Sequence, residues 1–144
     1  MYELTKKRSS GYYIIFGIIV FAFITAVLKM AFQPRQTTLN DDLIKAANEI
    51  NSHAPIIIDS TTRLDRVNTL SEKILQYNYT LLTVDKTEID TNVLKSSGKE
   101  AMIQQMKQDS KSAIFRDNGI EVQATYTDKN GATITTISIL PNEY

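Results

Sequence analysis

The polar cluster best suited to chemistry in this sequence lies in the stretch DSTTRLDR, which contains Asp59, Arg63, Asp65 and Arg66. Two acids and two basic residues this close together could form a substrate site or a charged recognition edge. The same alternation is typical of a strand edge whose charges discourage pairing with another chain. We favour the strand edge, and we treat these four residues, with Asn78 farther along the chain, as the candidate interaction site.

No other set of residues has the composition of a catalytic or metal site. The chain holds one histidine, His53, and no cysteine, so a metal site would need carboxylates. The adjacent acids Asp41 and Asp42 suit the start of a helix instead. No serine lies in a Gly-x-Ser-x-Gly elbow, and the five glycines form no phosphate-binding loop. The sequence therefore predicts no catalytic residue, no metal and no cofactor.

The segment KKRSSGYYIIFGIIVFAFITAVLKM has the length and composition of a membrane span. Residues 11–28 carry no charge, and a helix of this length covers about 27 Å of the roughly 30 Å hydrocarbon core of a bilayer. Lys29 can extend its ammonium group to one interface, and the tyrosines at the other end suit the opposite interface. We predict a transmembrane helix over residues 11–32. The predicted anchor residues are Gly11, Tyr12, Tyr13, Leu28 and Lys29.

The basic residues predict the orientation of this span. Lys6, Lys7 and Arg8 precede it, whereas the basic residues that follow it are soon offset by acids. Positively charged flanks stay inside, so residues 1–10 are expected to form a cytoplasmic tail. Residues 39–144 are expected outside, in a periplasm or at the cell exterior, after a linker over residues 33–38.

Two other interpretations of the apolar segment stay open. A signal peptide would be cleaved at a small-x-small motif, and the alanines of this segment are not spaced for one. A basic stretch that ends in Gly11 before an apolar helix also resembles the leader of type IV pilins. Such helices usually carry a glutamate where this chain has Phe16.

Residues 39–144 are enough for one domain with its own core. The whole chain has 16 basic and 16 acidic residues, so no net charge attracts nucleic acid. Without cysteines the domain cannot form disulfides, and packing alone must stabilise it.

The spacing of apolar residues predicts two helical regions. In the first, Leu39, Leu43, Ala46 and Ile50 recur at helical intervals, and this helix should end at residues 51–53, before Pro55. These positions are expected to face the core.

The second helical region is expected over residues 90–116, in two pieces. Gly98 weakens its middle, and Ser97 with Glu100 can cap a new start. Ile103, Met106, Ser110, Ala113 and Ile114 are the expected inward positions. The DNG sequence at residues 117–119 should end the region, because glycine tolerates a left-handed backbone.

Four strands are expected, in two pairs. The stretch from residue 55 to 84 is typical of two strands with a turn near residues 68–72. Its second strand should bury Leu75, Tyr77, Tyr79 and Leu81 and turn Gln76, Asn78 and Thr80 to water. Ile120, Val122, Ala124 and Tyr126 alternate in the same way before DKNG, which predicts a hairpin.

Together these elements predict an α+β fold. We expect an N-terminal transmembrane helix followed by a small domain with an antiparallel sheet of about four strands and two helices, in the order α-β-β-α-β-β.

The stretches PIIIDSTTRLD, QYNYTLL and FRDNGIEVQATYTDKNGATITTISI resemble a group of small exported or membrane-anchored bacterial proteins of uncharacterised function. The matching positions are Pro55, Asp59, Thr62, Leu64, Tyr77, Tyr79, Gly119, Tyr126, Asp128, Gly131, Ile134 and Thr136. The resemblance implies a bacterial envelope protein and supplies no reaction. Several such proteins carry two cysteines, which this chain lacks, so it can share no disulfide with them.

We therefore expect a single-pass envelope protein that contacts membrane lipid through its anchor and binds another protein through its outer domain, as a subunit or modulator of a membrane complex. Nucleic acid is not an expected partner. The first alternative is an envelope enzyme that acts on wall or lipid substrates through the cluster from Asp59 to Arg66. The others are a phage or plasmid exclusion factor and an atypical pilin-like protein.

Overall fold

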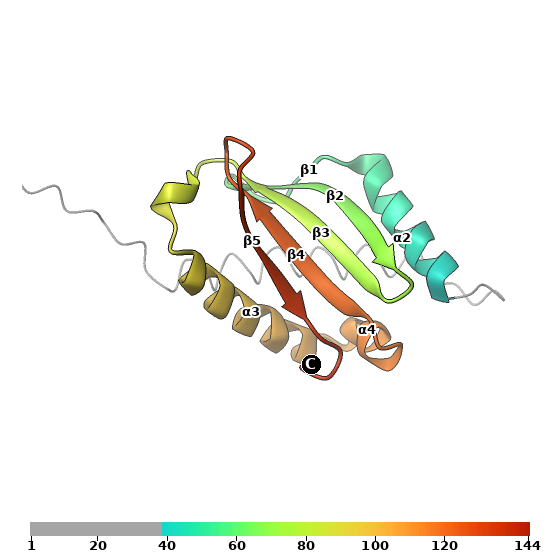
Figure 1. The fold of residues 1–144 in the computed structure, drawn as a ribbon. Coiled ribbons are helices and arrows are strands. Elements are labelled where there is room, and N and C mark those ends of the chain that lie inside the picture. The colour runs from blue at the N-terminus through green and yellow to red at the C-terminus, as the bar shows by residue number, and fades with distance from the viewer. Residues whose placement is uncertain (1–38) are drawn as a thin grey trace, which may run out of the picture.

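The computed structural model describes residues 39–144, which form one twisted sheet flanked by helices (Figure 1). The elements are, in chain order, α2 (Leu39–His53), β1 (Ile56–Ile57), β2 (Thr62–Ser71), β3 (Ile74–Leu81), the 3-10 helix η1 (Lys86–Glu88), α3 (Thr91–Gln108), the 3-10 helix η2 (Ser110–Ser112), α4 (Ala113–Asp117), β4 (Glu121–Thr127) and β5 (Thr133–Ile139).

The sheet is mixed and has five strands in the order β1-β2-β3-β4-β5. All neighbours are antiparallel except β3 and β4, which are parallel. The predicted antiparallel sheet of four strands and two helices is therefore wrong. The connection through α3 returns the chain to the same end of the sheet, so β4 must run parallel to β3. A bend at residues 59–61 also separates the short β1 from β2, and the second helical region divides into α3 and α4.

The predicted N-terminal transmembrane helix also needs correction. Residues 11–32, with Gly11, Tyr12, Tyr13, Leu28 and Lys29, lie outside the described residues, as does the predicted tail. Among residues 39–144, no helix is both long enough and apolar enough to cross a membrane.

The core lies on one face of the sheet, and its strand positions follow the predicted alternation. Leu75, Tyr77, Tyr79 and Leu81 of β3 are all buried, and so are Ile120, Val122, Ala124 and Tyr126 around β4. In the parallel register Tyr79 lies beside Tyr126, and their rings stack with centroids 5.5 Å apart. The alternation of strand side chains thus predicted the buried face correctly.

Helix α2 lies along the β2 side of the sheet (Figure 1). It ends at His53, as predicted from Pro55, and it buries Leu43, Ala46, Ala47 and Ile50. The side-chain amide of Asn51 donates to the main-chain oxygen of Val67 and accepts from the Val67 N–H, both at 2.7 Å. The Asn51 amide therefore pairs with the main-chain groups of Val67 that a further strand would use at this edge of β2.

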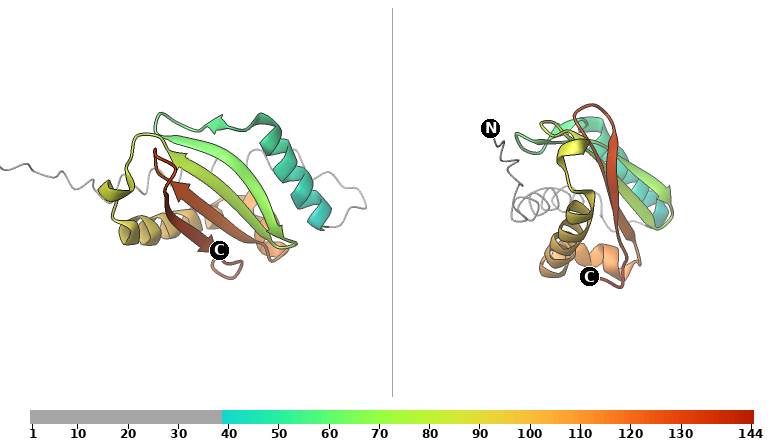
Figure 2. Two further views of the ribbon diagram at one scale, coloured as in Figure 1. Left: turned by 45° about the horizontal axis from the view of Figure 1, so that its top comes forward. Right: turned by 60° about the vertical axis from the view of Figure 1, so that its left-hand side comes forward.

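Helix α3 runs without a break through Gly98, contrary to the prediction of two pieces at this point. The break comes later, at Asp109, where the Asp109 N–H donates to Gln105 O. Gly98 is buried against β5, and a Cβ atom at this position would lie 2.9 Å from Ile137 Cδ1. Gly98 is thus explained by close packing of helix on strand. The right-hand view of Figure 2 shows α3 against one face of the sheet.

The inward stripe predicted for this region is only partly correct. Met106 is buried and Ile103 and Ile114 are partly buried, but Ser110 is exposed. The predicted left-handed stop is confirmed, because Gly119 has a φ of 64° after α4. The hairpin between β4 and β5 is confirmed as well.

Candidate functional site

Strand alternation gives this sheet two unlike faces. The face that carries the tyrosines is covered, since α2, α3 and α4 all contribute buried residues to the same core. The side chains between the buried positions are partly or fully exposed, and they form what we call the open face. The open face comprises Arg63, Asp65, Arg66 and Asn68 of β2, Gln76, Asn78 and Thr80 of β3, Glu121, Gln123 and Thr125 of β4, and Thr136 and Ser138 of β5.

The strand register aligns these residues in rows across the sheet. One row runs Arg66, Asn78, Thr125, Thr136, and the next runs Asn68, Gln76, Gln123, Ser138. A third row begins with Arg63 opposite Thr80. Neighbouring side chains in such rows are close enough to interact directly.

The row of Arg63 contains an ion pair at the edge of the open face. Arg63 Nε lies 2.5 Å from Asp65 Oδ1, and Thr80 Oγ1 donates to Asp65 Oδ2 at 2.5 Å. Arg63 and Asp65 are two residues apart on β2 and therefore share a face. The register shift between Leu64 and Arg66 places one extra residue in β2 relative to β3 at this point. Both carboxylate oxygens of Asp65 are therefore engaged, one by a cation and the other by a hydroxyl.

Arg66 is the exposed cation of the open face. It lies opposite Asn78, whose side-chain amide donates to the main-chain oxygen of Arg66 at 3.4 Å. The described residues offer no ion-pair partner to the Arg66 guanidinium. Its five donors are therefore available to a carboxylate or carbonyl of another molecule.

A chain of side-chain amides crosses the centre of the open face. Asn68 Nδ2 donates to Gln76 Oε1 at 3.3 Å, and Gln76 Nε2 donates to Gln123 Oε1 at 3.4 Å. Gln123 Nε2 and Ser138 Oγ both donate to Glu121 Oε1, at 2.7 and 2.6 Å. Because the amides are paired with one another, their positions are defined before any partner binds.

The sequence predicted only part of this surface. Arg63, Asp65, Arg66 and Asn78 come together on the open face, while Glu121, Gln123 and Ser138 were missed as site residues. Their alternation with buried residues was visible in the sequence. Their alignment with β3 was not, because it depends on the parallel pairing of β3 with β4.

Asp59 does not join this surface. It lies in the bend between β1 and β2, where its Oδ1 accepts from the Thr61 N–H at 2.7 Å and from Thr61 Oγ1 at 2.8 Å. This local pattern is an Asx turn, which stabilises the bend. The carboxylates of Asp59 and Asp65 therefore make separate sets of contacts and do not form an acid–base pair.

The other residues considered for chemistry have local structural partners. His53 lies in the last turn of α2, exposed, with Nδ1 3.0 Å from Glu49 O. Asp41 and Asp42 lie in the first turn of α2, as predicted for acids at a helix start. Within residues 39–144, no three side chains of the types that bind metals cluster together.

The buried tyrosines are part of the core. In the described structure, the hydroxyl groups of Tyr77 and Tyr79 are buried and have no hydrogen-bond partner. Burial raises the pKa of Tyr77, Tyr79 and Tyr126 well above the ordinary tyrosine value of about 10. These residues fill the covered face and do not line a groove.

Asp128 fixes the turn that joins β4 to β5. The side chain is 2% exposed and accepts main-chain N–H bonds from Lys86 at 3.0 Å, Asn130 at 2.9 Å and Ala132 at 2.8 Å. Burial opposes ionisation, but the three N–H donors outweigh it and hold the pKa of Asp128 below its usual value. The aspartate thereby ties this turn to η1.

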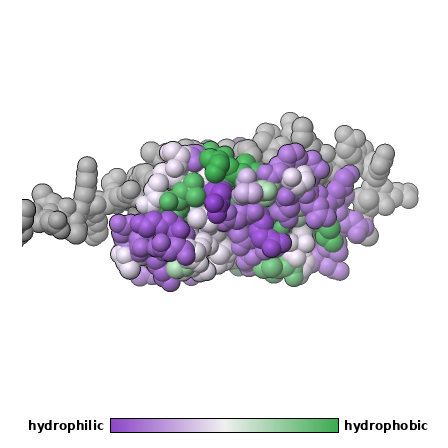
Figure 3. Space-filling model, turned by 90° about the horizontal axis from the view of Figure 1, so that it is seen from above, coloured by the Kyte–Doolittle hydropathy of each residue, from purple (hydrophilic) through white to green (hydrophobic). Residues whose placement is uncertain are grey.

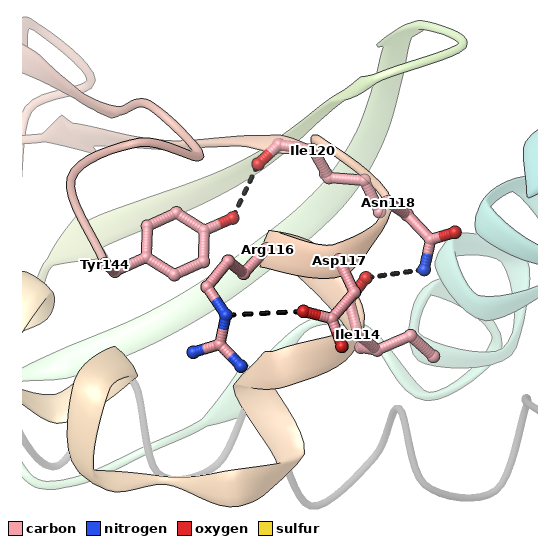
Figure 4. A network of polar contacts seen from close by, with 6 residues as sticks. All are labelled: Ile114, Arg116, Asp117, Asn118, Ile120 and Tyr144. Atoms are coloured by element: carbon pink, nitrogen blue, oxygen red, sulfur yellow. Dashed lines mark hydrogen bonds and ion pairs between the residues drawn. The ribbon is translucent and has the colours of Figure 1, made fainter.

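A second polar network fixes the start of β4 (Figure 4). Tyr144 Oη donates to Ile120 O at 2.7 Å, and Asn118 Nδ2 donates to Ile114 O at 2.7 Å. Arg116 Nε lies 3.3 Å from Asp117 Oδ1 at the exposed end of α4. The first contact joins Tyr144 to the residue before β4 and the other two lie at the end of α4, and all three suit a structural role.

The molecular surface offers no large apolar patch on the face seen in Figure 3, where hydrophobic areas are small and separated by hydrophilic ones. The large hydrophobic residues that are exposed lie on separate segments: Ile44, Ile57, Leu70 and Leu140. Polar contacts must therefore contribute much of any recognition by this domain.

Comparison with known proteins identifies both a family and a shared fold. Residues 38–135 match the model of a family described as a domain of unknown function (DUF8479). No curated protein matches the chain.

Solved structures share the fold at low sequence identity. A Pseudomonas aeruginosa protein described as a candidate secreted protein has a TM-score of 0.60 and 14% identity, covering 73% of this chain and 91% of its own. The pilotin EpsS of the Vibrio vulnificus type 2 secretion system has a TM-score of 0.57 and 15% identity, covering 73% and 90%. The type II secretion system pilotin AspS of Vibrio cholerae has a TM-score of 0.53 and 10% identity, covering 74% and 92%. At these identities the likeness concerns the fold.

Proposed function

The chain belongs to the family described as a domain of unknown function (DUF8479), and we propose that its domain acts outside the cytoplasm as a protein-binding subunit of an envelope complex. The open face is the proposed binding surface. No reaction is assigned to it.

The observation that carries this proposal is the arrangement of polar groups on the open face. Its amides and hydroxyls are held in rows by one another, and Arg66 projects beside them without an ion-pair partner among the described residues. A surface of fixed donors and acceptors loses little freedom when a partner binds. A single exposed guanidinium at its margin favours a partner segment with a carboxylate.

The shared fold supports the same proposal. Two of the structures that share it are named as pilotins of a type II secretion system, and the third is described as a candidate secreted protein. The shared fold supports a role in a protein assembly. The proposed binding surface itself is inferred from the residues of this chain.

The alternative of an envelope enzyme has less support. It relied on the cluster from Asp59 to Arg66, whose two carboxylates are separated by the bend and engaged with Thr61 and with Arg63 and Thr80. A catalytic constellation needs a reactive group beside a free base, which this cluster does not offer.

Location can be tested with a single cysteine, because the natural chain has none. Thr125→Cys places a thiol on the open face. Intact cells are treated with a maleimide that does not cross the cytoplasmic membrane. We expect labelling in intact cells at the level seen after lysis; labelling only after lysis contradicts a location outside the cytoplasm.

Partner binding is tested by photocrosslinking in cells, with a photoreactive residue at Asn78 and a matched one at Lys107, which is exposed on α3. We expect a discrete heavier species from position 78 and none from position 107. Equal crosslinking from both positions, or none from position 78, contradicts the open face as the binding surface.

Charge reversal gives the matching prediction. Arg66→Glu should reduce the yield of the crosslinked species several-fold, because the introduced carboxylate repels an acidic partner segment. Lys107→Glu, which makes the same change of charge on the other side of the sheet, should leave the yield unchanged. An unchanged yield with Arg66→Glu shows that Arg66 is not part of the interface.

A further inference from the structure

The two edges of the sheet differ in how their main-chain groups are used. At the β2 edge, β1 pairs with Arg63 and Leu64, and Asn51 pairs with both main-chain groups of Val67. At the other edge, no strand or side chain in residues 39–144 pairs with the outer side of β5.

The register shows which groups of β5 point outward. Glu121 N–H donates to Lys73 O at 2.8 Å, on the β3 side of β4. The main-chain N–H and C=O groups of successive residues in a strand point to opposite sides. The groups of Val122 and Ala124 therefore point to their partners Ile139 and Ile137 in β5. The main-chain N–H and C=O groups of Thr136 and Ser138 therefore point away from the sheet.

The C-terminal tail uses the next outward position. Leu140 N–H donates to Glu143 Oε2 at 2.8 Å, and Glu143 is held in turn by Lys99 at 2.8 Å. The tail thus occupies the position that follows β5, and Thr136 and Ser138 are left for another strand.

Within residues 39–144, the features that usually protect an edge strand lie away from Thr136 and Ser138: the β4–β5 register shift is at Tyr126 and Thr127, and the tail occupies only the position after β5. Its sequence, TITTISI, has no charge and no proline, and it is rich in β-branched residues. Exposed edges of this kind normally carry lysine, proline or a covering element. We propose that the β5 edge accepts an extended, uncharged segment of a partner protein as a sixth strand, through the main-chain groups of Thr136 and Ser138.

The side chains beside the edge define the chemistry of that segment. On the open face, Thr136 and Ser138 end the two polar rows, and Thr136 Oγ1 lies 2.9 Å from Thr125 Oγ1. On the covered face, Ile137 and Ile139 are buried. A segment that alternates threonine or serine with aliphatic residues continues both patterns.

A second copy of this chain is a poor occupant of the edge. Helix α3 packs on β5, with Gly98 against Ile137. Pairing two β5 strands about a two-fold axis would set them about 4.8 Å apart, whereas two helices need about 8–10 Å between their axes. The two α3 helices would overlap, but a single extended segment adds no helix.

The test uses the full chain in a mild detergent and a fluorescent peptide of seven alternating threonine and valine residues, with one lysine at each end for solubility. We expect saturable binding by fluorescence anisotropy. In amide hydrogen exchange, the peptide should slow exchange at Thr136 and Ser138 and leave Ile137, which already faces β4, unchanged. Binding without protection at Thr136 and Ser138 overturns the proposal, and so does absence of binding.

Two controls isolate the main-chain contacts. The same peptide with all seven amides N-methylated keeps its side chains but donates no N–H, and it should not bind. In the protein, Thr136→Pro removes an outward N–H and keeps the pairing with β4, so binding should weaken by about tenfold or more. Thr136→Val loses the same hydroxyl but keeps the N–H and should bind as the unmodified chain does. Equal affinities for the methylated and unmethylated peptides overturn the proposal, even if Thr136→Pro fails to fold.

The inference rests on the main-chain groups of β5 and not on Arg66, which lies at the opposite end of the row that ends in Thr136. Arg66→Glu should leave peptide binding unchanged, so each of the two surfaces can fail without the other. A chain dimer by sedimentation that Thr136→Pro dissociates would overturn the partner segment in favour of a second copy.

Discussion

At the scale of single residues, hydroxyl groups of buried tyrosines differ in whether they are paired. Tyr79 is fully buried and its hydroxyl has no hydrogen-bond partner within residues 39–144, while Tyr144 donates to Ile120 O at 2.7 Å. Tyr79→Phe should raise the free energy of unfolding by about 1 kcal/mol, because it removes a hydroxyl that loses its hydration on folding without gaining a hydrogen bond. Tyr144→Phe, the matched control, should lower it by about 1 kcal/mol by deleting a hydrogen bond. Urea unfolding of the full chain measures both, and equal signs for the two variants contradict this explanation.

At the scale of elements, the contact of α3 with β5 depends on the absence of a side chain at Gly98. Gly98→Ala should change the free energy of unfolding little, since about 1 kcal/mol of helix propensity offsets a displacement of the end of the Ile137 side chain. Gly98→Leu should cost about 1–3 kcal/mol by overpacking. Ile137→Ala destabilises alone and should recover part of that cost in combination with Gly98→Leu. The free energies of unfolding are measured by chemical denaturation. If the changes caused by Gly98→Leu and Ile137→Ala are strictly additive, the two side chains do not contact each other.

At the scale of the whole molecule, buried tyrosines make stability depend on alkaline pH. Burial raises the pKa of Tyr77, Tyr79, Tyr126 and Tyr144 in the folded state, whereas tyrosines of the unfolded chain ionise near pH 10. The folded state thus keeps phenol protons that the unfolded state releases. The contribution of these tyrosines to stability should be constant below about pH 10 and fall above it, by up to about 1.4 kcal/mol per pH unit for each tyrosine. Denaturation midpoints from pH 8 to 11.5 should show a shallower fall in a Tyr77→Phe, Tyr79→Phe double variant, and the same fall in both proteins contradicts the assignment.

Across the whole molecule, the residues of the candidate site were predicted only in part. Arg63, Asp65, Arg66 and Asn78 were expected to interact with a partner, and the structure places all four on one surface. Asp59 was grouped with them because it is near in sequence, but a local turn with Thr61 directs it elsewhere. Sequence distance is a poor guide to position across a bend.

Local sequence was sufficient to predict the features that depend on near neighbours: the buried sides of β3 and β4, the end of α2 before Pro55, and the turns at Gly119 and Gly131. These follow from side-chain alternation and backbone geometry over a few residues. Three features became evident only in the folded domain: the parallel pairing of β3 with β4, the unbroken course of α3 through Gly98 and the unequal protection of the two sheet edges. Each of these depends on contacts between residues far apart in the chain, where packing outweighs local preference.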